Sequence, residues 1–382
     1  YNLGVTLRKK YPEIFTTKTT TAQINLYSSP VHRCQQSAAS QLMGLFPTGL
    51  YDLNISVATT SPKVLPPFEN IQNELEGMQA LPYGTSPFSM LIESEVLDVL
   101  IVPSEKSCPV AGEAIANYMK TQDKKYLDLT KSVSDMLKTA GYDPQKLVKK
   151  EYFSLHDIAV IFDETTSYLN FHDKLPSGIT QDLFSKLQPL ANIAFMGWYG
   201  QDEQYVRLIT HGIARHLQTA LTKLQNEKSG DLRTKFALYS AHDYNVFAFV
   251  MAWGLTSLEC QTQRARGQTP TTICLDIPAF ASSLILEIRK SSDTGALFVK
   301  PLLDGKLIVI CDSQKNSALG LCSAEEFLQI IQSKLLWPGN QKDFLTSCGN
   351  KYLLTDYQDN TPTKSQSNSE WLYQFLLVVA LI

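Results

Sequence analysis

The sequence lacks an excess of charge of either sign, and it lacks the residue spacings of a metal site. Its 34 Lys and Arg nearly balance 37 Asp and Glu, and the absence of a basic stripe argues against nucleic acid as a partner. None of the seven cysteines forms a Cys-x-x-Cys pair, and His32 is the one histidine within four positions of a cysteine. We therefore expect neither a metal nor a cofactor.

The apolar stretch at the C-terminal end of the sequence is too short to span a bilayer, which takes about 20 residues. The apolar tail at residues 371–382 has 12 residues and follows a polar, low-complexity linker at residues 351–370. Because the tail faces no obvious core, we expect either a membrane anchor that is cut short or processed, or a loose hydrophobic end. The chain begins with Tyr1 instead of Met, inside a predicted helix, so we expect a truncated chain.

What the sequence does contain is a mixture of strand and helix patterns. Its 382 residues are 44% hydrophobic, which fits a globular α/β protein with one large domain or two lobes. Residues from about 108 to 230 are mostly helical, with an apolar stripe of 3.6-residue spacing from Val206 to Leu224, and predict an inserted helical lobe. Strands are expected at residues 22–29, 97–103, 236–239, 282–288 and 297–310, and an irregular excursion is expected from about 48 to 90.

Two junctions between a strand and a helix carry ionisable side chains. In "KFALYSAHDYNVFAF", which starts at Lys235, a buried strand meets a buried helix at His242 and Asp243, and in "INLYSSPVHRC" Arg33 follows another strand. Sheets of α/β proteins place ligands at the carboxyl ends of strands, and helix N-termini favour anions. A bidentate Arg, a second donor from His and an acid from Asp suit a phosphate ester. For the His-Asp pair alone, a polar turn without function is the alternative.

The same stretches resemble the histidine acid phosphatases. "LYSAHD" before an apolar helix is similar to one motif of that family, and "LYSSPVHRCQQSAASQLMGLFP" is similar to its segment in which an Arg precedes a helix. Three further stretches match in the family's order: Cys108-Pro109, "FHDKLPSGITQDLFSKL" and "PAFASSLILE". The resemblance covers roughly residues 1–350. It implies the phosphoglycerate mutase-like histidine phosphatase fold, an α/β fold with a mixed sheet flanked by helices and a mostly helical inserted lobe.

The resemblance also implies roles for three residues. Arg33 and His242 correspond to phosphate-binding residues, and Asp243 corresponds to the acid that protonates the leaving group. The family's nucleophile, a histidine in an Arg-His-Gly-x-Arg-x-Pro motif, has no counterpart among the six histidines of this sequence. His211 is followed by Gly, but Thr210 precedes it, and it lies opposite the apolar stripe, so we expect it on a solvated helix face.

The cysteines fit an oxidising compartment. Order and family position imply a disulfide between Cys108 and Cys348. Cys260 and Cys274 flank one loop, and Cys311 and Cys322 flank another, so each pair could close locally. Cys34 is left over, and we expect it to be buried beside Arg33.

These observations predict an acid phosphatase that hydrolyses phosphate monoesters without a metal. The reaction would pass through a phosphohistidine, formed on a histidine that is missing from this chain. The alternative is a non-catalytic, membrane-associated phosphate-binding relative. Either protein is expected in the secretory pathway, as a lysosomal, secreted or membrane-anchored protein, and the N-glycosylation sequon at Asn54 is compatible with that location.

Overall fold

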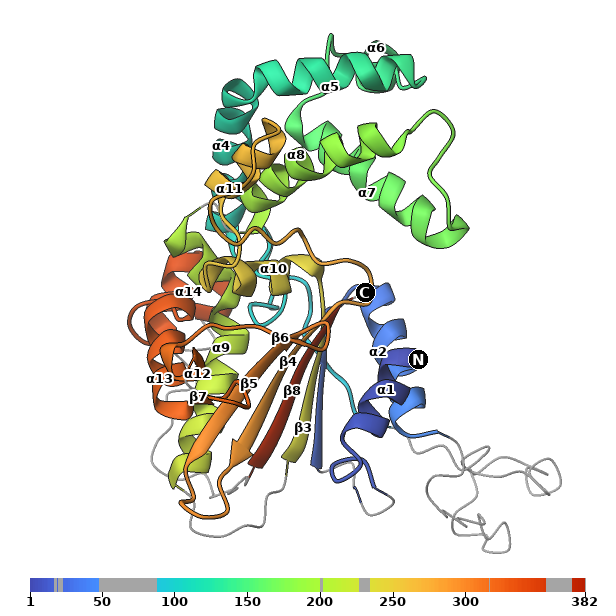
Figure 1. Ribbon diagram of the computed structural model, residues 1–382. Helices are drawn as coiled ribbons and strands as arrows, with labels where there is room; N and C mark the ends of the chain where they lie inside the picture. The colour runs from blue at the N-terminus through green and yellow to red at the C-terminus, as the bar shows by residue number, and fades with distance from the viewer. Residues whose placement is uncertain are drawn as a thin grey trace, which may run out of the picture.

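The computed structural model describes residues 1–16, 19, 23–47, 88–199, 202–226, 234–315, 317–354 and 373–381. Within this part of the chain an eight-stranded sheet has helices on both faces, and a further group of helices lies beyond one end of the strands (Figure 1). The predicted α/β class with an inserted helical lobe is confirmed. Asn54 and nearly all of the predicted excursion lie outside the described residues.

The sheet is parallel in one half and antiparallel in the other. Across the sheet, β2, β1, β3 and β8 run parallel, whereas β4, β5 and β6 are each antiparallel to their neighbours, and β7 pairs with β5. The strands are β1 (Ile24–Ser28), β2 (Leu91–Ile92), β3 (Thr234–Ala241), β4 (Ser283–Lys290), β5 (Leu297–Leu303), β6 (Lys306–Leu307), β7 (Cys322–Ser323) and β8 (Tyr373–Leu381).

Alternate residues of β3 face two layers of helices. Phe236 and Leu238 are buried with α1 and α2, whereas Ala237 and Tyr239 are buried on the opposite face with α9. Helices α1 and α2 are in close contact, because a Cβ on Gly4 would lie 2.0 Å from a backbone oxygen of α2. The helices of this lobe are α1 (Asn2–Lys10), α2 (His32–Leu45), α9 (Glu203–Asn226), α10 (Asp243–Ala252), α12 (Asp312–Lys315), α13 (Ala324–Ile330), the π-helix η4 (Ile331–Leu335) and α14 (Gln341–Cys348).

The second group of helices has a core of its own. Leu155 and Ile158 of α7 and Leu187 of α8 are fully buried in it, and Phe247 of α10 joins the same cluster and so connects it to the sheet lobe. The helices of the second group are α4 (Pro109–Lys125), α5 (Leu127–Thr139), α6 (Pro144–Leu147), α7 (Leu155–His172), α8 (Gln181–Tyr199) and α11 (Leu258–Ala265). They form the helical lobe at the top of Figure 1.

The strand predicted at residues 97–103 is wrong, because this segment has no strand conformation. Asp98 is buried, and its Oδ1 accepts hydrogen bonds from the backbone N–H groups of Leu100 (3.1 Å) and Ile101 (2.8 Å). Local side-chain bonds of this kind compete with a sheet ladder. The segment crosses α9 at Gly212, where a Cβ would lie 2.6 Å from Cα of Leu100.

The interpretation of the apolar tail as a loose end without a core partner is also wrong. Residues 373–381 of the tail form β8, in which Val378 lies opposite Leu238 of β3 on one edge and Ile285 of β4 on the other. The backbone of β8 is thus paired on both sides in the middle of the sheet (Figure 1). None of the helices in the described ranges has the length and apolar composition needed to cross a bilayer. Membrane association through the tail stays a prediction that this fold does not require.

The predicted disulfide between Cys108 and Cys348 is confirmed, and the two local pairs that the sequence left open are also formed. Cys108, just before α4, is bonded to Cys348 at the end of α14, and the two local pairs close the loops that their cysteines flank. Cys34 is buried and free, as predicted.

Candidate functional site

Two adjacent parallel strands bring the candidate residues to the same edge of the sheet. Ser28 at the end of β1 lies opposite Ser240 of β3, so the turns that follow both strands meet. The N–H of Ser29 donates to the carbonyl of Ser240 (3.1 Å), and the Ser240 hydroxyl donates to the carbonyl of Cys34 (2.7 Å). Arg33 in the first turn of α2 and His242 before α10 are therefore neighbours, as the sequence predicted.

His242 is held rigidly at the N-cap of α10. Its backbone N–H donates to Oδ1 of Asn245 (3.0 Å), and its ring is 4.9 Å from the Tyr244 ring in a stacked arrangement. Nε2 is hydrogen-bonded to the hydroxyl of Ser29 (2.8 Å) and lies 3.7 Å from Sγ of Cys34. These contacts leave His242 only 7% exposed, with its ring fixed at the end of β3.

Burial lowers the pKa of His242 to about 4, and the positive charge of Arg33 contributes in the same direction. The imidazole is therefore neutral at mildly acidic pH and has one N–H to donate. A bound phosphate would reverse part of this effect, because a nearby anion favours the protonated ring.

The pKa of Asp243 shifts in the opposite direction to that of His242. Burial raises its pKa to about 6, and the carboxylate of Asp163 contributes to the rise, whereas the Tyr244 N–H bond (2.8 Å) and Arg33 oppose it. The carboxyl group is thus protonated over much of the acidic range. A protonated acid beside an anion site is able to give its proton to a leaving alkoxide.

Arg33 is exposed, and its guanidinium forms no hydrogen bond or ion pair with any residue in the described ranges. Its charge nevertheless influences the pKa of four neighbours: Cys34, Asp163, His242 and Asp243. An unpaired cation at the N-terminal turn of α2 is suited to bind an anion, because the helix dipole favours negative charge at the same place.

Two polar residues of this region were not found from the sequence. Ser29 follows the end of β1, so the same strand-end rule that selected Arg33 would have selected it. Asp163 lies in α7 of the helical lobe, in "FDETTSYLNF", and no sequence pattern connects it with the strand ends. It lines a cavity of about 50 Å³ together with Asp243 and several apolar side chains.

The predicted solvated position of His211 is wrong. His211 is 1% exposed, its Nδ1 accepts the N–H of Trp337 (3.0 Å), and its Nε2 is hydrogen-bonded to Oε1 of Gln341 (3.0 Å). Its ring also stacks on Phe344, 4.0 Å away between centroids. The face of α9 opposite the apolar stripe is covered by α14 and the segment before it, so His211 is a structural residue.

A metal site has no support in the described residues. The one group there with closely spaced ligand atoms is Cys311, Cys322 and Glu326. The two sulfur atoms are joined in a disulfide and are not available as thiolate ligands.

The sequence profile of the histidine phosphatase superfamily (branch 2) matches residues 1–304. Prostatic acid phosphatase of Homo sapiens is 25% identical over 263 residues, 66% of this chain and 57% of that protein. Lysosomal acid phosphatase of Xenopus laevis is 25% identical over 262 residues, 66% of this chain and 51% of that protein. The chain thus spans little more than half the length of these relatives.

Solved structures show the same fold at lower identity. The phytase from D. castellii aligns with a TM-score of 0.54 and 16% identity, over 95% of this chain and 69% of that one. The phytase from Citrobacter braakii aligns with a TM-score of 0.53 and 14% identity, over 87% of this chain and 84% of that one.

Proposed function

The chain belongs to the histidine phosphatase superfamily, branch 2, and we propose that it supplies the phosphate-binding and acid groups of an acid phosphatase that hydrolyses phosphate monoesters. The observation that carries the proposal is the convergence of Arg33, His242 and Asp243 at one sheet edge, where two helix N-termini also lie. The proposal agrees with similarity to two acid phosphatases.

The binding step uses Arg33 and His242. The exposed guanidinium of Arg33 pairs with two phosphoryl oxygens, and the neutral ring of His242 donates one N–H to a phosphoryl oxygen, exchanging its bond with Ser29. Fixed donors of this kind stabilise charge that develops on the phosphoryl group in the transition state.

The acid step uses Asp243. With a pKa of about 6, its carboxyl group carries a proton at the pH of an acidic compartment. It transfers this proton to the bridging oxygen as the bond from phosphorus to that oxygen breaks, so the product leaves as a neutral alcohol.

Attack on phosphorus is assigned to a histidine of the Arg-His-Gly-x-Arg-x-Pro motif that the family resemblance implies. The 382 residues do not contain this motif. We therefore predict phosphate binding by the chain itself, and turnover by a protein that also carries the motif.

The cellular location follows from the disulfides and the relatives. Three disulfides and similarity to acid phosphatases indicate the secretory pathway. We propose a lysosomal or secreted destination, in keeping with the lysosomal acid phosphatase that the chain resembles.

Calorimetric titration with inorganic phosphate at pH 5 tests the binding site. The unsubstituted chain is expected to bind, and Arg33→Gln should weaken binding about 10–100-fold, because a hydrogen bond to a charged group contributes about 1.5–3 kcal/mol. Arg266→Gln is the matched control, since Arg266 pairs with Asp128 on the helical lobe. Equal binding by the two variants would contradict the site.

The second candidate function is a phosphate-binding protein without turnover, which would need only the anion site at Arg33 and His242. The two candidates differ in the gene sequence that precedes Tyr1. An Arg-His-Gly motif there, with hydrolysis of phenyl phosphate only when it is present, identifies the enzyme. A gene without that motif, whose product binds phosphate but releases no phenol, identifies the binding protein.

A further inference from the structure

The cavity beside Asp243 is built by both lobes. Asp243 comes from the sheet lobe, and the helical lobe adds Phe162, Asp163 and Thr166 of α7 and Phe195 of α8. The segment at residues 277–280 completes the wall with further apolar side chains. The cavity is therefore lined by the acid that would protonate a leaving group and by side chains that are mostly apolar.

The helical lobe adds one charged residue, Asp163, to the lining of this cavity. Asp163 is exposed, and its carboxylate has no hydrogen-bond or ion-pair partner within the described part of the chain. Partial burial of this carboxyl group raises its pKa, and the positive charge of Arg33 opposes the rise. Asp163 is thus an unpaired, exposed acid of the cavity lining, within electrostatic range of both Arg33 and Asp243.

Thr166 lies one turn further along α7, on the same side of the helix as Asp163. Its hydroxyl is buried and has no hydrogen-bond partner among the described residues. A buried hydroxyl without a partner costs free energy. The cavity therefore offers one neutral polar group, in addition to its apolar lining, to a ligand that enters it.

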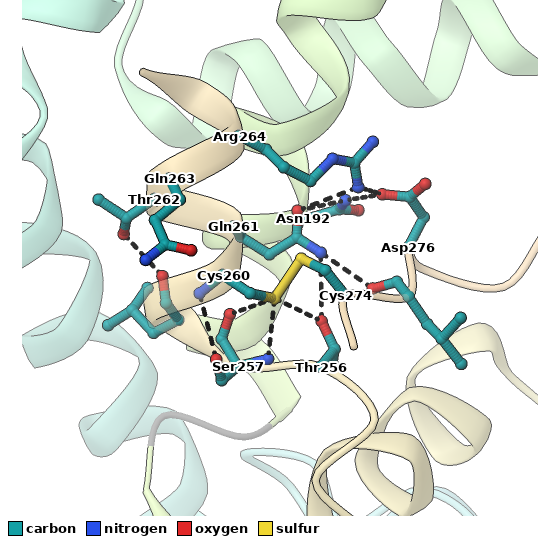
Figure 2. The surroundings of a disulfide bond; sticks show 12 residues. Asn192, Thr256, Ser257, Cys260, Gln261, Thr262, Gln263, Arg264, Cys274 and Asp276 are labelled. Carbon is teal, nitrogen blue, oxygen red and sulfur yellow. Dashed lines mark hydrogen bonds and ion pairs between the residues drawn. A yellow bond between two sulfur atoms is a disulfide. The ribbon is translucent and has the colours of Figure 1, made fainter. Parts of the chain in front are cut away.

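The cavity wall at residues 277–280 is held in place by a buried amide and a nearby disulfide. Figure 2 shows the Cys260–Cys274 disulfide next to Asn192, which is fully buried in α8. The amide of Asn192 donates to Oδ1 of Asp276 (2.6 Å), and its Oδ1 accepts the N–H of Ile277 (3.2 Å). A wall anchored by a disulfide and a buried amide presents a fixed shape to a ligand.

We propose that Asp163 is a specificity-determining residue, which disfavours esters whose alcohol part carries a second negative charge and favours an uncharged aryl or alkyl group in contact with the cavity lining. The apolar lining replaces water around such a group, and the Thr166 hydroxyl is free to bond its polar atom. An additional phosphate or carboxylate would meet an unpaired carboxylate of like charge. This inference rests on the proposed function, because it assumes a phosphoryl group bound at Arg33.

Two aryl esters that differ by one carboxylate group test the inference: phenyl phosphate and 4-carboxyphenyl phosphate. Their selectivity ratio is measured as kcat/KM where the protein turns them over, and as the dissociation constant where it only binds them. The unsubstituted protein should favour phenyl phosphate about tenfold, as a repulsion of about 1.4 kcal/mol gives. Asp163→Asn should reduce the ratio to roughly threefold or less.

Glu164→Gln is the matched control, since Glu164 is the next residue of α7, is exposed, and does not line the cavity. It loses the same charge and should keep the tenfold ratio. An unchanged ratio in Asp163→Asn, or an equal decrease in both variants, would overturn the inference and leave the proposed function intact. Failure of the unsubstituted protein to bind or hydrolyse phenyl phosphate would overturn the proposed function, and the inference with it.

Discussion

At the scale of single residues, Asp243 and His242 are neighbours in sequence whose pKa values move in opposite directions for the same cause. Burial disfavours the charged form of each, so it raises the pKa of Asp243 to about 6 and lowers the pKa of His242 to about 4. Between these two values the pair consists of a protonated acid and a neutral imidazole. That protonation state suits acid catalysis at acidic pH.

Replacement of Asp243 by Asn tests this assignment in the catalytically active protein. Hydrolysis of alkyl phosphates should fall by roughly 10²–10⁴-fold, and 4-nitrophenyl phosphate should be affected far less, because its leaving group needs no proton. In the unsubstituted protein the alkyl phosphate rate should decline as pH rises above about 6, when Asp243 loses its proton. An Asn variant with the same alkaline decline and unchanged turnover would remove Asp243 from the mechanism.

The sequence predicted Arg33, His242 and Asp243 of the site, and it missed Ser29 and Asp163. Arg33, His242 and Asp243 were predictable because the carboxyl ends of adjacent parallel strands share an edge. Asp163 depends on how the helical lobe packs over that edge, and this packing arises from contacts between distant segments. No local pattern in α7 encodes it.

At the scale of elements, α9 shows which buried face a hydrophobic period in the sequence predicts and which it does not. The stripe from Val206 to Leu224 is buried, as its 3.6-residue spacing predicted. The polar face was expected in solvent, yet His211 on that face is covered by residues more than 120 positions later in the chain, Trp337 and Gln341. The sequence period locates one buried face and carries no information about a second one.

Replacement of His211 by Gln tests its structural role. At pH 7 the free energy of unfolding should fall by about 1–3 kcal/mol, because the Trp337 N–H loses a well-placed buried acceptor. Burial first, and Arg215 to a lesser degree, lower the pKa of His211 to about 4. Its contribution is therefore complete above an unfolded pKa of about 6.5 and is lost as pH falls through about 4.

Urea unfolding at pH 7 and pH 5 measures this effect. The stability difference between the unsubstituted protein and His211→Gln should narrow at the lower pH. The variant His156→Gln is the control, because His156 is exposed at the start of α7. A difference that widens on acidification would contradict the neutral, buried state of His211.

At the scale of the whole molecule, the layers were predictable and the order of strands was not. Alternating strand and helix patterns determine that a sheet has helices on both faces. The position of β8 between β3 and β4 depends on pairings across more than 80 residues of intervening chain. An apolar run read in isolation indicates no such partner, which is why the sequence predicts either an anchor or a loose end for the tail and not a strand of the sheet.

The Cys108–Cys348 disulfide, with a sequence separation of 240 residues, should contribute most to stability among the three. Replacing both cysteines by Ala is expected to cost about 2–5 kcal/mol, because the crosslink restricts a very long loop in the unfolded chain. The Cys311–Cys322 pair, with a separation of 11 residues, is the matched control and should cost less. Thermal unfolding of both double variants gives the comparison, and a larger loss for the short loop would contradict this ranking.

The same disulfide has a consequence for proteolysis. The cysteines at 108 and 348 enclose the helical lobe, α9, α10 and most of the sheet within one covalent ring. A protease that cuts the backbone once anywhere inside that ring opens it without releasing a fragment. Nicked and intact molecules therefore have nearly the same mass until a reducing agent separates the pieces. A protein sample that looks homogeneous on a non-reducing gel can consist largely of cleaved chains.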